Sequence, residues 1–415
     1  MIRLPLLYLL MATPLSAQPA DFATFLADVE GAGNAERQAL VEAFWDRLPR
    51  TPLIESDTTA VLLWRGEAQS VGVLGDMGAW AATLPLTRLA GTDLWYRRLH
   101  AEPEARLEYL FMVDESSEGF GAELLGLPDP RNPDRVLSGF GPFSELTMPG
   151  YAYPEVFAAV RDGTPGTADG LDVHPLPAGV LPYDRKVLVY TPPGYASEPT
   201  TRYPTVYLMD GRDYIEFAHA PAVLDDLIAR GEIEPILAVF VDPPNRHAPA
   251  SPNRMTEYGL NDDFVAFLAD ELVPFVDARY RTRTTPDARL IVGDSYGGLI
   301  ATYVPFSRPD VFGLGYSQSA YYSFQDDRMI RLLDQEPVRP IRLFVDIGTY
   351  ETTVGPGMLP AAETNFLAAN RRLRDVLAER GYDFVYAEYP QGHTWGNWRA
   401  HLIDGLRHFF PARHR

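Results

Sequence analysis

The sequence predicts a two-domain α/β protein, in which a mostly parallel sheet with helices on both faces follows a smaller β-sandwich. From residue 171 onward, short apolar segments alternate with longer helical stretches, which is typical of parallel strands joined by helices. Residues 60–113 contain instead short alternating segments separated by Gly, Asp and Pro turns, which favours a sandwich. The chain has 415 residues, of which 46% are hydrophobic, enough to fill two cores.

Changes in this pattern give the expected domain limits. Apolar residues recur at helical spacing near the start, so residues 18–57 are predicted to be a helical segment. The sandwich is expected over residues 58–150, a linker over 151–170 and the α/β domain over 171–415.

The first residues have the pattern of a secretory signal peptide. Arg3 precedes an apolar stretch, and small residues follow at Ser16 and Ala17, so residues 1–17 are predicted to be removed on export. The protein is then expected to be periplasmic or secreted. The alternative is a disordered or buried amphipathic N-terminus, because the apolar stretch is too short to span a bilayer.

Composition excludes several kinds of function. The chain has no cysteine, so disulfides and thiolate metal sites are ruled out. Its formal net charge of -20 opposes nonspecific binding to nucleic acid or to anionic membranes. We therefore expect neither a nucleic acid nor a membrane as a partner.

The most informative motif is Gly293-Asp294-Ser295-Tyr296-Gly297-Gly298, which directly follows an apolar run. It places a serine where a buried strand must turn sharply into a helix, the pattern of a nucleophile elbow. A serine hydroxyl is a weak nucleophile by itself, so Ser295 needs a base, an acid and an oxyanion hole elsewhere in the chain.

The expected base and acid follow in the chain order nucleophile, acid, histidine. His393 comes just after the last predicted strand, at the carboxyl edge where parallel sheets bind ligands, and is the candidate general base. Asp346 and Glu351 compete for the acid. Glu351 is favoured, because it lies in the loop beyond the strand, whereas Asp346 lies at the strand's end and would face the sheet.

The oxyanion hole needs two backbone donors. The expected donors are the N–H groups of Tyr296, which follows the nucleophile, and of Arg212, in the turn after the strand at 205–208. The alternative for Asp210-Gly211 is a simple tight turn. The proposed chemistry requires no metal or cofactor.

Substrate-binding candidates come from aromatic and arginine residues near these positions. Arg254 could clamp an anionic substrate, or pair with Glu257 or another neighbouring carboxylate. Aromatic residues would hold a flat acyl group. The aromatic candidates are Tyr214, Tyr321, Tyr322, Trp395 and Trp398.

These motifs make the second half similar to the enterochelin (ferric enterobactin) esterase family of α/β-hydrolases. The likeness rests on Tyr207-Leu208-Met209-Asp210-Gly211, on the elbow motif and on Gly392-His393-Thr394-Trp395-Gly396-Asn397-Trp398-Arg399. It implies catalytic roles for Ser295, His393 and Glu351, with Arg212 supplying the second oxyanion N–H. The chain departs from the family pattern at Asp294, where glutamine is frequent, and at Thr394, where aspartate is frequent.

The first half resembles the early-set, immunoglobulin-like sandwich that precedes such esterases and is itself similar to glycogen-binding modules. The likeness rests on segments such as Val73-Leu74-Gly75-Asp76-Met77-Gly78-Ala79-Trp80 and Asp129-Pro130-Arg131-Asn132-Pro133.

Together, the two resemblances imply a serine esterase that cleaves a catecholate trilactone siderophore, with any iron arriving on the substrate. The alternative is a feruloyl or acetyl esterase whose sandwich binds carbohydrate through Trp80 or Trp95. A noncatalytic binding protein on the same scaffold is the hypothesis of a different class.

Overall fold

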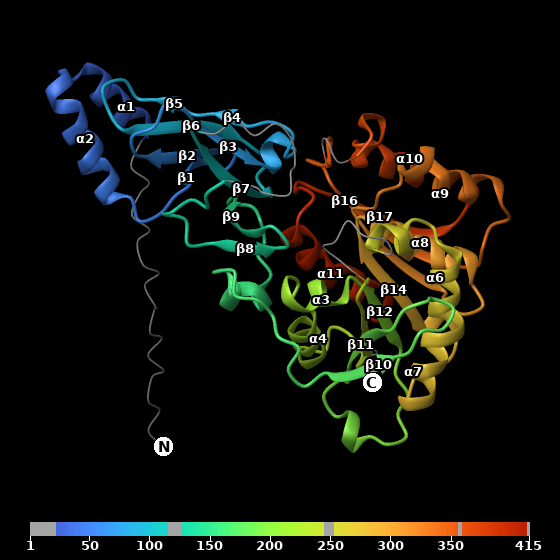
Figure 1. The fold of residues 1–415 in the computed structure, drawn as a ribbon. Helices are drawn as coiled ribbons and strands as arrows, with labels where there is room; N and C mark the ends of the chain where they lie inside the picture. The colour runs from blue at the N-terminus through green and yellow to red at the C-terminus, as the bar shows by residue number, and fades with distance from the viewer. Residues whose placement is uncertain (1–21, 115–125, 245–252, 356–358, 413–415) are drawn as a thin grey trace, which may run out of the picture.

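The computed structural model describes residues 22–114, 126–244, 253–355 and 359–412. They form a smaller N-terminal lobe of two helices and two antiparallel sheets, and a larger lobe built on an eight-stranded sheet (Figure 1). The predicted signal peptide, residues 1–17, lies outside the described residues. Within the described ranges, no helix combines the length and apolar character that crossing a membrane requires.

The N-terminal lobe has two sheets that share one hydrophobic core, called here the sandwich (residues 53–147). In spatial order, the first sheet contains β1 (Leu53–Ser56), β2 (Thr59–Arg65), β6 (Leu94–His100) and β5 (Thr87–Arg88). The second contains β4 (Leu84–Pro85), β3 (Val71–Gly75), β7 (Arg106–Val113), β9 (Gly141–Thr147) and β8 (Arg135–Ser138). A likeness of this lobe to immunoglobulin-like or early-set domains stays a prediction.

Side-chain alternation along β2 explains how the N-terminal helices attach. Ala60 and Leu62 join the core between the sheets, whereas Val61 and Leu63 face the opposite way and pack with α1 (Phe22–Gly31) and α2 (Asn34–Arg47). The predicted helical segment ends earlier than expected, because β1 already pairs with β2 from Leu53.

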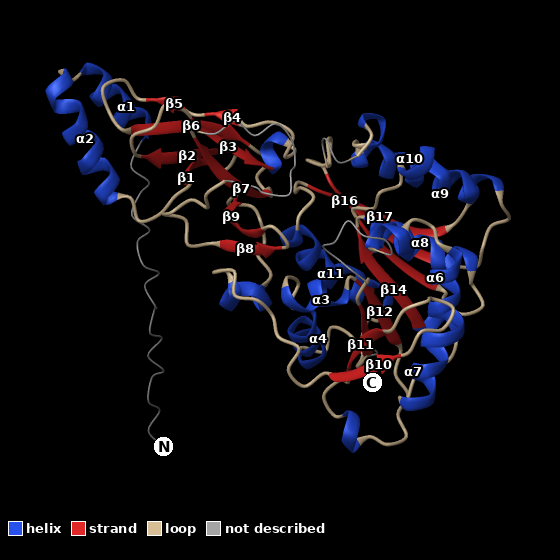
Figure 2. Ribbon diagram, in the orientation of Figure 1, coloured by secondary structure: helices blue, strands red, loops and turns tan. Residues whose placement is uncertain are grey.

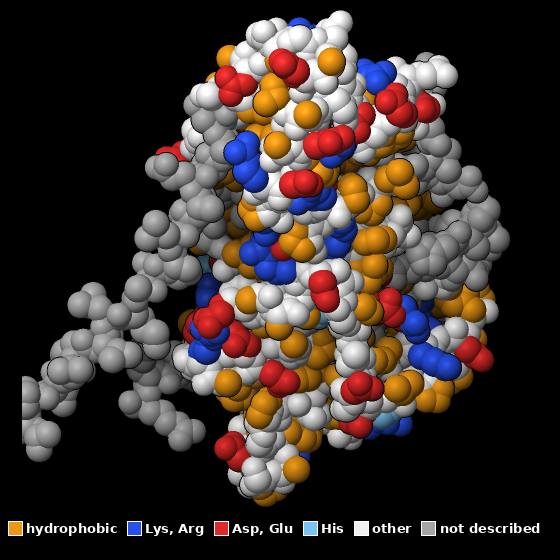
Figure 3. All heavy atoms as spheres, turned by 90° about the vertical axis from the view of Figure 1, so that its left-hand side faces the viewer, with side chains coloured by type: hydrophobic (Ala, Val, Ile, Leu, Met, Phe, Trp, Pro, Cys, Tyr) orange, Lys and Arg blue, Asp and Glu red, His pale blue; other side chains and the backbone are white. Residues whose placement is uncertain are grey.

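Acidic, basic and hydrophobic side chains are interspersed over the face that Figure 3 shows.

The larger lobe contains the predicted, mostly parallel sheet. Six strands from β13 to β17 in spatial order are parallel, and β10 and β11 extend the sheet antiparallel at one edge. Their spatial order is β10 (Asp172–Leu176), β11 (Arg185–Tyr190), β13 (Leu237–Val241), β12 (Thr205–Met209), β14 (Arg289–Asp294), β15 (Leu314–Gln318), β16 (Arg342–Gly348) and β17 (Asp383–Tyr389).

Helices cover both faces of this sheet (Figure 2). Along β12, Val206 and Leu208 join one core, and Tyr207 and Met209 join the core on the other face. The first core includes residues of α3 (Gly211–Glu216), α4 (Ala220–Ala229) and α11 (Trp395–Phe409). The second includes residues of α5 (Arg254–Tyr258), α6 (Asp262–Ala266), α7 (Val273–Arg279), α8 (Tyr296–Ser307), α9 (Phe324–Gln335) and α10 (Phe366–Arg380).

Most differences from the predicted elements are small. The sequence predicts a single helix over residues 262–277, and the structure has a π-helical stretch there, Phe267–Leu272, between α6 and α7. The turn expected after β12 leads into α3 and α4, two helices that the sequence did not predict. The edge strand β10 was not predicted. It contains a histidine and a proline, and most of its side chains are exposed, so its sequence lacks the apolar run that marks a buried strand.

Candidate active site

Ser295 lies at the turn between β14 and α8, in a backbone conformation that residues other than glycine rarely adopt. Its φ is 55° and its ψ is -117°. Such strain persists only where the surrounding structure imposes it, and it recurs at functional sites. A Cβ atom on Gly293 would lie 2.3 Å from the carbonyl oxygen of Gly297, so the turn requires glycine at Gly293.

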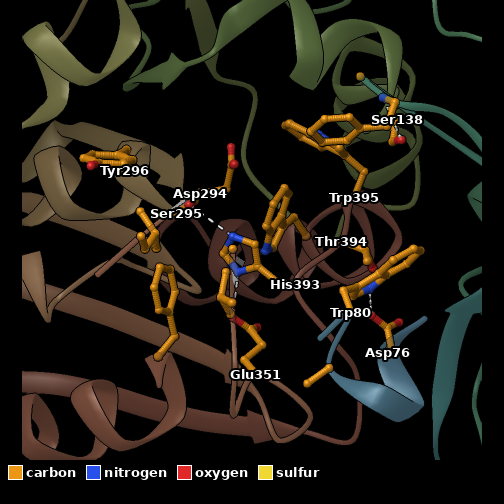
Figure 4. Close-up of a pocket in the computed structure, with 18 of the residues that line it drawn as sticks. Asp76, Trp80, Ser138, Asp294, Ser295, Tyr296, Glu351, His393, Thr394 and Trp395 are labelled. Atoms are coloured by element: carbon orange, nitrogen blue, oxygen red, sulfur yellow. Dashed lines mark hydrogen bonds and ion pairs between the residues drawn. The ribbon is translucent and has the colours of Figure 1, made fainter. Parts of the chain in front are cut away.

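His393 lies in the loop between β17 and α11 and joins Ser295 to Glu351 by hydrogen bonds (Figure 4). Its Nε2 atom is 3.1 Å from Ser295 Oγ, and its Nδ1 atom is 2.7 Å from Glu351 Oε2. These are the contacts that a base needs to take a proton from the serine while an acid orients the imidazole ring.

Two further donors hold the Glu351 carboxylate in place. Its Oε1 atom accepts a hydrogen bond from Ser319 Oγ at 2.6 Å and another from the backbone N–H of Gly348 at 2.9 Å. The side chain is fully buried. Oε2 is thereby directed at His393, as expected for the favoured acid.

Asp346, the alternative acid, points elsewhere. Its Oδ2 atom accepts a hydrogen bond from the Tyr316 hydroxyl at 2.5 Å inside the sheet core. Burial raises the pKa of Asp346 to about 8, and the negative charge of Glu351 acts in the same direction. Asp346 is therefore bonded to Tyr316, whereas Glu351 holds the orienting position at His393 Nδ1.

The raised pKa of Asp346 gives a prediction for stability. Its pKa in the unfolded chain is about 4, so the folded state holds a proton that the unfolded state releases as the pH rises. This contribution to the free energy of unfolding is complete below about pH 4 and is lost as the pH rises through about 8. Between these limits the wild type should lose stability relative to Asp346→Asn. Urea unfolding of both proteins across this range would refute the prediction if the two curves ran parallel.

The two predicted oxyanion donors differ in their surroundings. Tyr296 is the first residue of α8, where backbone N–H groups have no partner within the helix, and its role stays a prediction. The Arg212 N–H instead donates to Asp242 Oδ1 at 2.6 Å, and the Arg212 side chain is exposed. The Arg212 amide is therefore bonded to Asp242 and not presented to a substrate, so its assignment as an oxyanion donor gains no support from this geometry.

Arg254 lines the cavity next to Ser295 and bridges two carboxylates. Its Nη2 atom lies 2.6 Å from Asp210 Oδ2 and 3.4 Å from Asp294 Oδ2, and also donates to the main-chain oxygen of Asp294 at 2.9 Å. Glu257, the other partner considered, pairs instead with Arg185. Arg254 thus ties the loop after β12 to the elbow, with its charge already compensated.

Three of the aromatic substrate-binding candidates do not line the cavity. Tyr214 is buried, with its hydroxyl bonded to Gln318 at 2.8 Å. Tyr321 stacks on Phe366, and Tyr322 bonds Ser317 and Thr302 in the core. The structure therefore gives no support to a binding role for these three residues, because aromatic residues near a strand end also pack the core. Of the aromatic candidates, Trp395 and Trp398 do line it.

The cavity in front of Ser295 has a volume of about 440 Å³, and both lobes contribute to its wall. Sequence reasoning did not assign the sandwich residues to this site. Trp80 stands opposite His393 beside Asp76, which accepts a hydrogen bond from the Trp80 indole at 2.6 Å (Figure 4). The other sandwich residues of the wall are Ala79, Ser138, Gly139, Phe140 and Phe143.

The fold and this site together place the chain among the α/β-hydrolases. Residues 178–409, more than half of the chain, match the family model described as "Esterase: Putative esterase". The chain therefore belongs to the esterase family and is a carboxylic ester hydrolase.

Two enterobactin esterases are similar over nearly the whole chain, and a feruloyl esterase is similar over part of it. The chain is 26% identical to the iron(III) enterobactin esterase of Dickeya dadantii (strain 3937), over 94% of this chain and 96% of that protein. The ferric enterobactin esterase structure from Salmonella typhimurium is similar in fold, with a TM-score of 0.71, 20% identity and coverage of 89% and 98% of the two chains. An endo-1,4-beta-xylanase/feruloyl esterase of Xylanibacter ruminicola is 31% identical, over 30% of this chain and 18% of its own length.

Proposed function

We propose that Ser295, His393 and Glu351 are the catalytic triad of a serine esterase that cleaves ester or lactone bonds of an enterobactin-like catecholate trilactone siderophore. The observation that carries the proposal is the hydrogen-bonded line from Ser295 through His393 to Glu351, beside a cavity whose wall includes several aromatic side chains. The substrate class is supported by relatives named for enterobactin that match both lobes, including the sandwich that forms part of the cavity wall.

In this reaction His393 Nε2 accepts the Ser295 proton as Oγ attacks the ester carbonyl. The Tyr296 N–H stabilises the oxyanion, and His393 then protonates the leaving alcohol. Water, activated by the same imidazole, hydrolyses the acyl-enzyme and frees Ser295. Glu351 keeps the Nδ1 proton in place throughout, and no step requires a metal or cofactor.

The charges around the cavity bear on whether the iron-free or the ferric siderophore is the better substrate. Fully deprotonated catecholates around Fe(III) leave a net negative charge, whereas protonated catechols are neutral. Asp213 and Asp294 line the cavity, and the Arg254 guanidinium already pairs with Asp210 and Asp294. We therefore expect the iron-free trilactone to be hydrolysed at least as fast as its ferric complex, because like charges oppose entry of an anion.

A substrate panel tests this proposal. Iron-free enterobactin, ferric enterobactin, methyl ferulate and acetylated xylan are each incubated with wild type and with Ser295→Ala, and products are identified by liquid chromatography and mass spectrometry. Serine-dependent cleavage of the trilactone, led by the iron-free form, is the expected result. Cleavage of ferulate with no turnover of either trilactone would overturn the siderophore assignment.

Feruloyl or acetyl esterase activity on polysaccharides remains the competing outcome of that panel. Solvent-exposed aromatic residues on the sandwich would favour this activity, because they could bind the polysaccharide. Trp80, however, is 5% exposed and Trp95 is 6% exposed. The Trp95 indole also donates to the backbone of Gly66. Neither tryptophan offers a flat, solvent-facing surface for a sugar ring, so carbohydrate binding by the sandwich has no support from these two residues.

We also propose that the enzyme acts in the periplasm or outside the cell. The support is the signal-peptide pattern of residues 1–17, together with a cysteine-free composition that an oxidising compartment would not affect.

A further inference from the structure

The loop that carries His393 is bonded at both ends to strand β7 of the sandwich. The Arg106 N–H donates to the carbonyl oxygen of Pro390 at 3.2 Å. At the other end, the Gly396 N–H donates to Glu108 Oε1 at 3.1 Å. One strand of the N-terminal lobe thus holds the chain before and after His393, although 288 residues separate Glu108 from Gly396.

The same loop packs so closely against the sandwich that two of its positions leave no room for a side chain. A Cβ atom on Gly392 would lie 2.0 Å from Asp76 Oδ1, and one on Gly396 would lie 1.7 Å from the Arg106 guanidinium. Asp76 is itself fixed, because its Oδ2 atom accepts the Glu108 N–H at 2.7 Å. The position of the loop therefore depends on β7 and on the turn that carries Asp76.

A buried ion-pair network makes this contact specific. Arg106 is 1% exposed and pairs with Glu108 and Glu145, each at 2.7 Å. Arg399 of α11 lies 3.6 Å from Glu145, so the network extends into the helix that follows the loop. Burying charges costs desolvation energy that apolar packing would avoid, and the best-attested use of such groups is to fix one arrangement.

Contacts within the larger lobe also restrain the loop. The Tyr350 N–H donates to the Gln391 oxygen at 3.1 Å, and the Asn397 side chain donates to the Gly392 oxygen at 3.0 Å. These bonds act close to His393, whereas the bonds from β7 fix where the loop begins and ends. If the imidazole were displaced, substrate would still bind next to Ser295. Proton transfer between Ser295 Oγ and the imidazole would become slow.

We propose that Glu108 is a positioning residue for His393, so that the sandwich is a structural part of the catalytic apparatus and not only a wall of the cavity. The proposal rests on the function assigned above to His393. It assigns to β7 the role of keeping the imidazole aligned with Ser295 Oγ.

Substitutions at Glu108 test the proposal, with kcat and KM measured on p-nitrophenyl acetate. Glu108→Leu removes the acceptor for the Gly396 N–H and should lower kcat by on the order of 10- to 100-fold with KM little changed, because small misplacements of a catalytic group have effects of this size. Glu108→Gln keeps a carbonyl oxygen for the same N–H and should restore most of the activity. The matched control is Tyr153→Phe, which removes the 2.8 Å bond from Arg399 of α11 without touching the loop, and should match wild type.

Gly392→Ala tests the same contact without altering a buried charge, and so applies even if Glu108→Leu fails to fold. Its added methyl group would push the loop away from Asp76, and the same fall in kcat is expected. Circular dichroism and gel filtration establish that each variant compared is folded. Wild-type kcat in folded Glu108→Leu or in folded Gly392→Ala would overturn the proposal. Equal hydrolysis by wild type and Ser295→Ala would instead refute the proposed function itself, so the two failures are distinguishable.

Discussion

Replacing Ser295 with alanine is expected to lower kcat for ester hydrolysis by about a million-fold, the size of effect seen when a serine hydrolase loses its nucleophile. Without Oγ no acyl-enzyme can form, and the remaining catalysis comes only from binding and the oxyanion donors. Steady-state hydrolysis of p-nitrophenyl acetate and of the trilactone measures the loss. A fall of only a few-fold would mean that another group attacks the ester.

Folding and binding should be unaffected in this variant. Ser295 is held by the strand-to-helix turn around it, and its hydroxyl has a hydrogen bond to His393 that alanine merely removes. Thermal unfolding close to that of wild type, and retained binding of the trilactone by calorimetry, are the controls. They separate loss of chemistry from loss of structure.

Replacing Glu351 with glutamine should have the second-largest effect, a decrease in kcat of about ten-thousand-fold. The amide keeps the shape of the side chain but removes the negative charge next to His393 Nδ1 and permits the wrong imidazole tautomer. The pH dependence of kcat measured alongside will show whether activity recovers at high pH, as expected when the imidazole is the group affected.

Asp346→Asn is the matched control for this substitution. Asp346 lies within β16, the strand that precedes Glu351, is equally buried, and is bonded to Tyr316 instead of His393. Its amide variant should keep kcat within a few-fold of wild type, since surface or core polar changes away from the reacting atoms act mainly on stability. Comparable losses in both variants would contradict the assignment of Glu351 as the acid.

The parts of the site that depend on local sequence could be predicted from it. The elbow around Ser295 and the loop with His393 are short motifs at strand ends, and parallel strands bring their carboxyl ends to one edge of a sheet. The choice between Glu351 and Asp346 was harder, because it depends on which way a side chain turns at the end of β16. Ser319 and Gly348 decide it by bonding one carboxylate oxygen of Glu351.

Other features could not be read from local patterns. Tyr214, Tyr321 and Tyr322 follow strand ends just as binding residues do, but tertiary packing uses them in the core. The contribution of Trp80 and Asp76 to the cavity depends on how the two lobes dock, which brings residues more than 300 positions apart in the sequence close to His393. No periodicity within either lobe encodes that docking.

Covalent trapping of the nucleophile tests the central claim most directly. Wild type is treated with diisopropyl fluorophosphate, the mass shift is measured on the intact protein, and the labelled peptide is sequenced by tandem mass spectrometry. A single adduct on Ser295, absent from Ser295→Ala and strongly slowed in His393→Ala, is the predicted result. An adduct on a different residue, or full hydrolytic activity in protein that carries the adduct on Ser295, would contradict the account.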